Sequence, residues 1–534
     1  MMKKMCLILS ALLLIGILPL ISPFAHVDVH ASGDTFVVGM EAAYAPFNWT
    51  QNDDNNGAVP INGVPGQYAN GYDVQVAKQI AEHLGKTLVI EKIAWEGLLP
   101  ALQSGKIDAI IAGMSPTEER RQQIDFTDGY YSSSLVIMVQ RDGPFAHATS
   151  LQDFTGARLT AQLGTFHYDM ITQIDGALQQ PASSSFSSMR VALLSGAIDG
   201  YIAEEPEGMT AEIATPSFKM ISFADGKGFT LDESKQQVAI GVRKDDPILL
   251  GINEWLVTFT QADREQLMND MVKVQPDVAS TDAWYLQILH IIQDNGVQFL
   301  RGTRTTLIVS LVGTVIGTII GLLIGVYRTI PKMKSKLGAF CYQLFNWIIS
   351  AYIEIFRGTP MIVQAMVLFY GTALAFGISF DRMTAALLIV SINTGAYMSE
   401  IVRGGIYAVE KGQFEAAQAV GMTHSQTMCK VILPQVLRNI LPATGNEFVI
   451  NIKDTSVLSV IAVTELFFQG NTVAQQNFMY FQTFAVICAI YFVLTFTVTR
   501  ILRYAEKKMD GPDAYVAIKN QMQTTKLDQG TSIK

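Results

Sequence analysis

The sequence predicts an α/β domain of two lobes, followed by an all-α membrane domain of about five transmembrane helices. Strand-like and helix-like segments alternate over residues 32–275, whereas apolar runs separated by short polar connectors fill the chain from residue 303 onward. These runs approach about 20 residues, the length that a helix needs to cross a bilayer. At 534 residues and 49% hydrophobic, the chain is too long for one domain and too apolar for a wholly soluble protein.

The first 31 residues have the pattern of a secretory signal. Lys3 and Lys4 precede an apolar run at residues 7–21, and the small-residue site VHA follows at residues 29–31. We therefore expect the next domain to lie outside the cytoplasm, and the alternative is an uncleaved signal that serves as an extra anchor. Cys6 precedes the apolar run, so it is misplaced for lipid attachment, and the other cysteines all lie in the membrane half. No disulfide is therefore expected in the exported domain.

The exported domain begins with a predicted strand at residues 35–40, a helix at 72–85 and a second strand at 87–93. Two lobes of similar build are predicted because ALQSGKIDAI, at residues 101–110, is echoed by ALLSGAIDGY at residues 192–201. The expected boundaries are lobe 1 at about 35–132 and 230–275, lobe 2 at about 133–229, and a linker at 276–302. The chain is expected to cross between the lobes near 130–135 and about 226–232.

The membrane domain is expected to cover residues 303–510, with a polar cytoplasmic tail at 511–534. The predicted spans are about 305–327, 360–378, 383–402, 440–465 and 478–500. The apolar stretch 337–357 carries Glu354 and Arg357, so we expect an interfacial helix there. Lysines and arginines follow the first span, recur between 403 and 438, and close the last span, which places these segments in the cytoplasm. The sequence thus predicts a multi-pass cell-membrane protein with an extracytoplasmic N-terminal domain.

Two features inside the spans stand out. Gly313, Gly317, Gly321 and Gly325 recur every four residues, which predicts a helix face that a neighbouring backbone approaches closely. Lys453 and Asp454 sit in an apolar context, where charge is costly and usually lines a cavity or is paired. Two readings stay open for this pair: it faces a translocation path, or it is a structural pair or bend near the cytoplasmic face.

A polar segment between two apolar runs, EAAQAVGMTHSQTMCKVILP at residues 415–434, resembles the EAA motif of the membrane subunits of ATP-binding-cassette importers. The matching residues are Glu415, Ala416, Ala417, Gly421 and Pro434. EIFRGTP at 354–360 and NEFVINIKDTSVLSVI at 446–461 are typical of the polar amino-acid permeases in that family. The resemblance implies that residues 413–423 dock onto an ATPase, with Gly421 at a sharp turn, and that two copies of the chain form the pathway. No GxxxxGK[ST] motif occurs, so the ATPase is expected on a separate chain.

The exported domain resembles the periplasmic-type amino-acid-binding proteins, through GMEAAYAPF, GYDVQVAKQIA, PALQSGKIDAIIAGMSPTEERRQQIDFTDGYY and the later EEP. The resemblance implies that Arg120 pairs with the ligand α-carboxylate, for which a planar guanidinium is suited. The expected remainder of the carboxylate site is Gly113, Ser115, Thr117, Gly164 and Thr165. Glu204 is expected to accept from the α-ammonium; it is one methylene longer than the family's usual aspartate, and Glu205 is its alternative.

Ligand selectivity is expected from an acid and three aromatic residues, namely Glu41, Tyr44, Phe47 and Trp95. Two aromatic faces and a carboxylate suit a cation, so we predict arginine, lysine or histidine as ligand. Related proteins with an acid at the position of Glu41 also bind glutamine, which keeps glutamine and other polar amino acids as the alternative. Phe47 is otherwise a core residue, and His167, close to the Gly164 loop, is expected at the surface.

The sequence gives little support to other classes of function. The 7 histidines and 4 cysteines form no metal-ligand pattern, so no enzyme, metal or cofactor is expected. A net charge of −9 without a basic block argues against a nucleic-acid partner. A ligand-gated channel or receptor with a two-lobed amino-acid-binding domain is the alternative from another class. A channel would insert its pore into the second half of that domain, and a signalling receptor would need an output domain where only a short polar tail follows.

Overall fold

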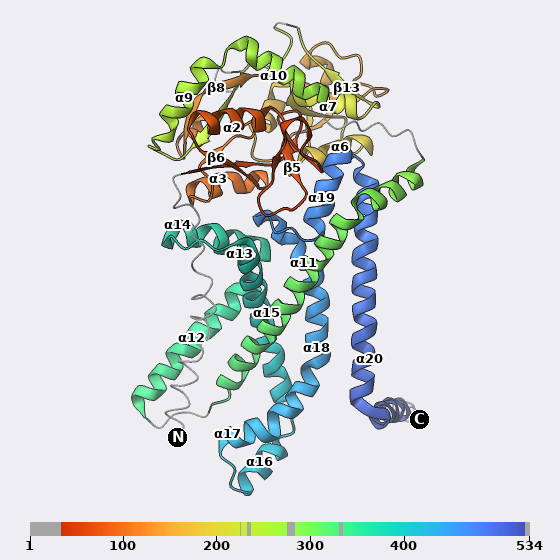
Figure 1. Cartoon of the computed structure of the whole chain (residues 1–534). Helices are drawn as coiled ribbons and strands as arrows, with labels where there is room; N and C mark the ends of the chain where they lie inside the picture. Colours follow the sequence, from red (N-terminus) through yellow and green to blue (C-terminus); the bar gives the residue numbers. More distant parts are fainter. Residues whose placement is uncertain (1–33, 225, 232–235, 275–282, 331–334, 529–534) are drawn as a thin grey trace.

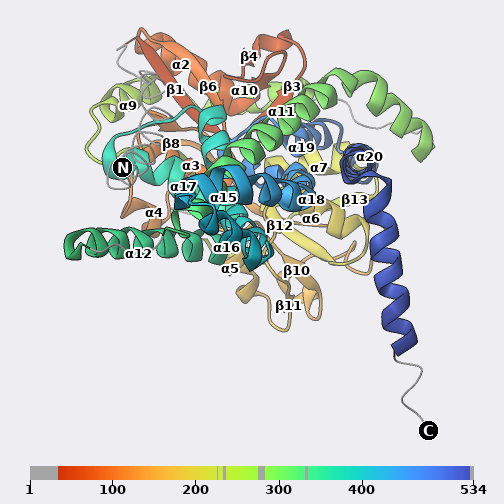
Figure 2. The same cartoon turned by 90° about the horizontal axis from the view of Figure 1, so that it is seen from below.

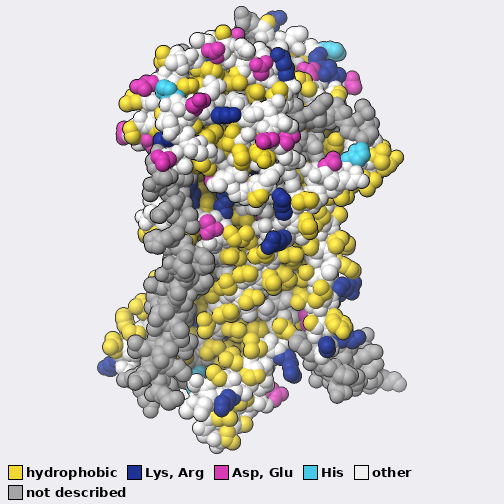
Figure 3. All heavy atoms as spheres, viewed as in Figure 1, with side chains coloured by type: hydrophobic (Ala, Val, Ile, Leu, Met, Phe, Trp, Pro, Cys, Tyr) yellow, Lys and Arg dark blue, Asp and Glu magenta, His cyan; other side chains and the backbone are white. Residues whose placement is uncertain are grey.

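The α/β domain sits on one end of a bundle of long helices (Figure 1). The computed structural model describes residues 34–528, except 225, 232–235, 275–282 and 331–334, and describes side chains as far as residue 508. The predicted signal at residues 1–31 lies outside the described residues. The helical part presents mostly apolar side chains on the face seen in Figure 3, whereas charged side chains are scattered over the α/β domain. This division matches the two predicted domains.

Lobe 1 is built on a five-stranded sheet in which four strands run in one direction and β14 (Gln237–Val242) runs antiparallel to its two neighbours. Its order is β6 (Thr87–Lys92), β1 (Thr35–Met40), β7 (Ala109–Ile110), β14 and β8 (Asp125–Ser132). The helices of this lobe are α2 (Tyr72–His83), α3 (Trp95–Gln103), α4 (Glu118–Arg121), α9 (Ile248–Thr258) and α10 (Gln261–Val274). Fully buried side chains such as Phe36, Ile80 and Leu98 form its core.

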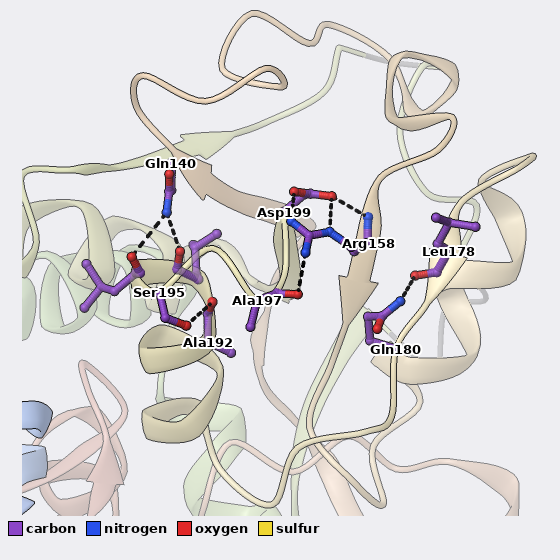
Figure 4. Close-up of polar contacts among 10 residues, drawn as sticks. Gln140, Arg158, Leu178, Gln180, Ala192, Ser195, Ala197 and Asp199 are labelled. Carbon is purple, nitrogen blue, oxygen red and sulfur yellow. Dashed lines mark hydrogen bonds and ion pairs between the residues drawn. The ribbon is translucent and has the colours of Figure 1, made fainter.

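Lobe 2 repeats this plan. Its sheet has the order β11 (Leu178–Gln179), β10 (Arg158–Thr160), β12 (Gly200–Glu204), β9 (Leu135–Gln140) and β13 (Phe218–Ile221). Its helices are α5 (His167–Met170), α6 (Phe186–Leu194) and α7 (Glu205–Ala214). Figure 4 shows how polar contacts join its elements: Arg158 of β10 pairs with Asp199, just before β12, at 2.7 Å, and Gln140 of β9 donates to carbonyls at the end of α6.

The repeated sequence falls on equivalent elements of the two lobes. Residues 101–110 lead into β7, and residues 192–201 lead into β12; each of these strands is the third of its sheet and pairs with an antiparallel fourth strand. The chain passes from β8 to β9 at residues 133–134, inside the first expected crossing. Around the second expected crossing, Leu231 packs in lobe 2 and Gln236 accepts a hydrogen bond from Ser133, while residues 225 and 232–235 lie outside the described part of the chain.

A small sheet beside lobe 1 was not predicted. It has the antiparallel order β2 (Ala43–Tyr44), β3 (Asn48–Gln51), β5 (Tyr68–Asn70) and β4 (Val59–Pro60). Its strands have two to four residues, too few to show an alternating pattern in the sequence. This sheet carries part of the pocket on one edge and contacts the membrane domain through β3.

The described part of the membrane domain contains three helices that are long and apolar enough to cross a bilayer, and five spans if two bent pairs each count as one. The three are α11 (Trp284–Tyr327), α15 (Arg382–Tyr407) and α20 (Tyr480–Asp528), in which the candidate span lies within Tyr480–Lys508. The first bent pair joins α12 (Lys336–Gly358) to α13 (Met361–Met366) and α14 (Thr372–Phe376) at 116°. The second joins α17 (His424–Thr427), α18 (Leu433–Asp454) and η6 (Thr455–Ile461) to α19 (Leu466–Asn477) at 57°.

Several boundaries differ from the expectation. Residues 284–302 are not a linker but the start of α11, continuous with the first span. The stretch 337–357 is the long arm α12, while residues 361–376, expected as a span of their own, turn by 116° from α12 after Gly358 and lie beneath lobe 1, where Tyr370 packs against Gly97. The span expected at 440–465 tightens into η6 after Asp454 and bends by 57° after Ile461, and α20 remains helical through the expected tail as far as Asp528. From below, α12 and the end of α20 project on different sides of the bundle (Figure 2).

The glycine row packs α11 against α15, as predicted. A Cβ on Gly313, Gly317, Gly321 or Gly325 would come within 2.4–2.6 Å of a side chain on α15. The α15 residues that it would meet also recur every four positions, namely Val390, Thr394, Met398 and Val402. Only residues without a side chain allow this approach, so the row is a packing feature.

Candidate functional site

A pocket lies between the two lobes, at the carboxyl ends of the parallel strands, where open α/β sheets bind their ligands. It encloses about 340 Å³ of space not filled by atoms, with the solvent at its mouth included. It is lined by Glu41, Tyr44, Trp95, Gly113, Ser115, Arg120, Gln162, Thr165, Phe166, His167, Phe186 and Glu204. Eight of these twelve belong to the site predicted from the sequence.

Arg120, on the single-turn helix α4, reaches across the pocket from lobe 1 to lobe 2. Its Nη1 donates to the carbonyl of Ser115 at 2.8 Å, its Nη2 donates to the carbonyl of Gly164 at 3.0 Å, and its guanidinium lies 5.2 Å from the Trp95 ring centroid. Burial lowers the pKa of Arg120 to about 10 against the opposing effect of Glu204, so the group stays charged near neutral pH. A guanidinium has five donors, which leaves donors for a carboxylate.

Glu204, at the end of β12, is the buried acid of lobe 2. Tyr44 of lobe 1 donates a hydrogen bond to its Oε2, and His167 Nε2 lies 3.0 Å from its Oε1. Burial alone would raise the pKa of Glu204, but the charge of His167 and the hydrogen bonds from His167 and Tyr44 outweigh it, and the pKa lies below the ordinary value. Glu204 therefore offers an ionised carboxylate inside the pocket.

Glu41 follows β1 and lines the lobe 1 side of the pocket. Burial, with the nearby Glu96 carboxylate, raises the pKa of Glu41 to about 7, against the charge of Lys92 and a hydrogen bond with Gln162. A cation placed beside a carboxyl group with this raised pKa would lower the pKa again, because the cation stabilises the ionised form. The pocket thus holds two acids and one guanidinium, from both lobes.

Three expected site residues are placed differently. Phe47 is fully buried and stacks behind Tyr44 with ring centroids 5.2 Å apart, so it belongs to the core. The other face of Tyr44 is covered by Phe186 at 4.8 Å, so no Tyr44–Trp95 sandwich is formed. Thr117 is a buried residue before α4 that does not line the pocket.

Glu205, the alternative to Glu204, accepts a hydrogen bond from Ser134 at 3.0 Å and does not line the pocket. Gly164 contributes its carbonyl to Arg120 at a positive φ of 72°. Its neighbour Thr165 is among the lining residues. The second-lobe loop therefore meets Arg120 through a backbone carbonyl.

Sequence reasoning missed Gln162, Phe166 and Phe186 and placed His167 at the surface, where the structure buries it with 4% exposed. His167 is buried because it starts α5 with its ring toward Glu204, a partner far along the chain. The AQLGTFH motif contains three of these four residues, so closeness to Gly164 was the available signal.

The EAA segment forms two short helices at the end of the membrane domain farthest from the α/β domain (Figure 1). They are α16 (Lys411–Ala419) and α17, and Gly421 between them has a φ of 78°, the left-handed conformation that the predicted sharp turn requires. Glu415 and Ala416 are exposed, whereas Ala417 is buried with 5% exposed. The exposed face is thus presented away from the bundle.

Lys453 and Asp454 end α18, where the helix tightens into η6. α18 starts at the EAA end of the bundle and leads through η6 to α19, which lies beneath the α/β domain (Figure 1). Both side chains are exposed on the single chain. Among the described residues, no cluster of three or more His, Cys, Asp or Glu could hold a metal ion.

Comparisons with known proteins agree with this division. Residues 36–270 match the family of bacterial extracellular solute-binding proteins, family 3, and residues 337–511 match the binding-protein-dependent transport system inner membrane component. The glutamine transport system permease protein GlnP of Escherichia coli (strain K12) is 37% identical over 211 residues, 39% of this chain and 92% of GlnP.

Two further relatives carry arginine in their names. The arginine transport system permease protein ArtQ of Bacillus subtilis (strain 168) is 34% identical, over 32% of this chain and 78% of ArtQ. The arginine-bound form of truncated ArgBP from T. maritima is 29% identical, over 43% of this chain and 98% of that chain, with a TM-score of 0.36.

The membrane half covers nearly all of a curated permease, and the exported half matches a solute-binding family. The protein is therefore a multi-pass membrane protein with an extracytoplasmic binding domain, and it is a transporter component. The chain belongs to the polar amino-acid importers of the ATP-binding-cassette class, and it joins their solute-binding protein and their membrane permease in one polypeptide.

Proposed function

We propose that this chain captures a basic amino acid outside the membrane and passes it through its own membrane domain, in an importer driven by a separate ATPase. The observation that carries the proposal is the gathering of Arg120, Glu204 and Glu41 in one pocket between two lobes. An amino acid with a cationic side chain has one negatively charged and two positively charged groups. This pocket offers one guanidinium for the negative group and two carboxyl groups for the positive ones.

The backbone of the ligand would replace contacts that now join the lobes. Its α-carboxylate would take donors from Arg120 beside Ser115 and Thr165, in place of the Gly164 carbonyl. Its α-ammonium would donate to Glu204, in place of the Tyr44 hydroxyl. Because each exchange substitutes a charged partner for a neutral one, the bound ligand would hold the lobes together more strongly than their own contacts do.

The side chain of the ligand would lie between Trp95 and Glu41. An aromatic face and a carboxylate both attract a cation, and cation–π contacts contribute about 0.5–2 kcal/mol. Glutamine is the second candidate, favoured by the charge of Lys92, which acts on Glu41 and offsets part of its negative charge. The relatives named above carry both glutamine and arginine in their names, so the ligand has to be identified from binding to the pocket and not from the similarity of the permease.

The cytoplasmic partner would be an ABC ATPase that receives α16 and α17. The exposed Glu415 and Ala416 would contact it, while Ala417 packs the helix onto the bundle and Gly421 turns the chain back. A rigid pair of helices joined by a sharp turn suits this task, because it would transmit movement between the ATPase and the membrane domain without bending.

Two copies of the chain would form the translocation path. Lys453 and Asp454 are exposed on a single chain, and charged side chains at membrane depth avoid lipid and face protein or a cavity. A second copy placed against this face would remove both charges from lipid and make them part of the path.

The test is a calorimetric titration of the full chain in lipid nanodiscs with arginine, lysine, histidine, glutamine and glutamate. We expect a basic amino acid to bind and the binding to be lost in Arg120→Ala. Arg121→Ala is the matched control, since Arg121 is exposed and bonds only the Pro116 carbonyl among the described contacts of its guanidinium nitrogens. Binding of glutamine alone would overturn the basic-ligand proposal, and binding that survives Arg120→Ala would overturn the site.

A further inference from the structure

Helix α19 of the membrane domain is held by both lobes of the binding domain. Gln67 of lobe 1 donates to Gln469 at 3.0 Å, and Gln476 donates to Asn52 at 3.4 Å. From lobe 2, the guanidinium of Arg190 lies 4.5 Å from the ring centroid of Phe478, the residue directly after α19. Movement of one lobe against the other therefore acts on this helix directly.

One of the lobe 1 contacts is a buried lysine. Lys92 ends β6 and is 5% exposed, and its Nζ donates to Thr50 Oγ1 and to Thr472 Oγ1 of α19, both at 3.0 Å. Thr50 and Thr472 are themselves buried, with 2% and 1% exposed. Burial lowers the pKa of Lys92 to about 7, and an amine enclosed in this way depends on its hydrogen-bond partners, because water does not replace them.

The hydrogen bonds continue from Lys92 to the pocket. Thr50 Oγ1 donates to the carbonyl of Ala42 at 2.8 Å, and Ala42 follows the pocket residue Glu41. Ala42 has a φ of 50°, a left-handed conformation that is strained for a residue with a side chain and needs support from its surroundings. The strand pairing also brings Lys92 opposite Met40, the residue before Glu41.

We propose that Lys92 is a positioning residue that couples ligand binding to the membrane domain: Thr472 of α19 holds Lys92, Lys92 holds Thr50, and Thr50 fixes the backbone that carries Glu41. Contact with α19 therefore sets ligand affinity, and by thermodynamic reciprocity the ligand sets the strength of contact with α19. Lys92 and Glu41 also act on each other electrostatically. The inference rests on the proposed binding of an amino acid in this pocket.

The test places the substitution in the membrane domain, away from the pocket. Thr472→Val keeps the size of the side chain but removes the acceptor of Lys92. Gln476→Ala is the matched control, because it removes another contact of the same helix with lobe 1 and does not touch Lys92. Arginine and glutamine are titrated into the wild-type chain and both variants in nanodiscs, and the melting temperature is measured alongside.

We expect Thr472→Val to weaken binding by about fivefold or more, at the lower end of typical coupling between sites, with Gln476→Ala unchanged and similar melting temperatures for all three. Equal affinities in all three chains would overturn the inference while leaving the proposed function intact. An equal loss of affinity in both variants would also overturn the inference, because it would assign the effect to contact between α19 and lobe 1 in general and not to Lys92. If the wild-type chain binds neither amino acid, the proposed function fails first and this inference with it.

Discussion

Replacing Arg120 tests the ligand pocket most sharply. The guanidinium would form about two charge-assisted hydrogen bonds with the ligand carboxylate, each worth about 1.5–3 kcal/mol. Since Arg120 is only partly buried, we take the lower end, about 3–4 kcal/mol. At about 1.4 kcal/mol for each tenfold change, Arg120→Ala should weaken binding by about 100- to 1,000-fold.

The matched variants separate charge from geometry. Arg120→Lys keeps a positive charge but lacks the planar fork, so it should recover only about tenfold of the loss. Arg121→Ala, one residue along the same helix, should bind as the wild type does. All four chains are titrated in nanodiscs with the amino acid that the wild type binds. An Arg120→Ala chain within threefold of the wild-type dissociation constant would refute the assignment of Arg120 to the carboxylate.

Three further predictions follow from the pocket and the bundle. A cationic ligand would lower the pKa of Glu41 from about 7. The affinity for that ligand should therefore be highest above about pH 7 and fall by up to about tenfold per pH unit below it. Titrations between pH 5 and 8 should show this slope, and Glu41→Gln should remove it. Gly317→Ala should lower the melting temperature, since its Cβ would lie 2.6 Å from Thr394 Cβ, whereas Gly404→Ala meets no atom within 4 Å and should not. Gly421→Val should abolish ligand-stimulated ATP hydrolysis in the assembled importer and leave ligand affinity unchanged, because its φ of 78° excludes a branched side chain; full stimulation would contradict the predicted docking turn.

Features set by local pattern could be predicted from the sequence. The four-residue spacing of Gly313 to Gly325 is a property of one helix, and it sufficed to predict close packing before the partner helix was known. The left-handed turn at Gly421 is equally local. The echo between residues 101–110 and 192–201 predicted two lobes because each copy includes a helix end and the strand that follows.

Features set by distant contacts could not be predicted. His167 is buried because Glu204 lies beside it, and nothing near His167 in the sequence signals that partner. Hydropathy shows that residues 361–376 are apolar, but it does not show that they turn by 116° from α12 or that Tyr370 meets lobe 1 at Gly97. Lys92 looks like an ordinary strand-end lysine until Thr472 of the membrane domain is placed against it.

Uptake by the assembled importer tests the central claim most directly. The full chain is purified with the ATPase that accompanies it from its native membrane and reconstituted into proteoliposomes, and ATP-dependent uptake of labelled arginine is measured. The account predicts uptake by the wild type and by Arg121→Ala and none by Arg120→Ala. Uptake that persists in Arg120→Ala, or a wild-type chain that binds arginine but does not transport it when ATP is supplied, would contradict the account.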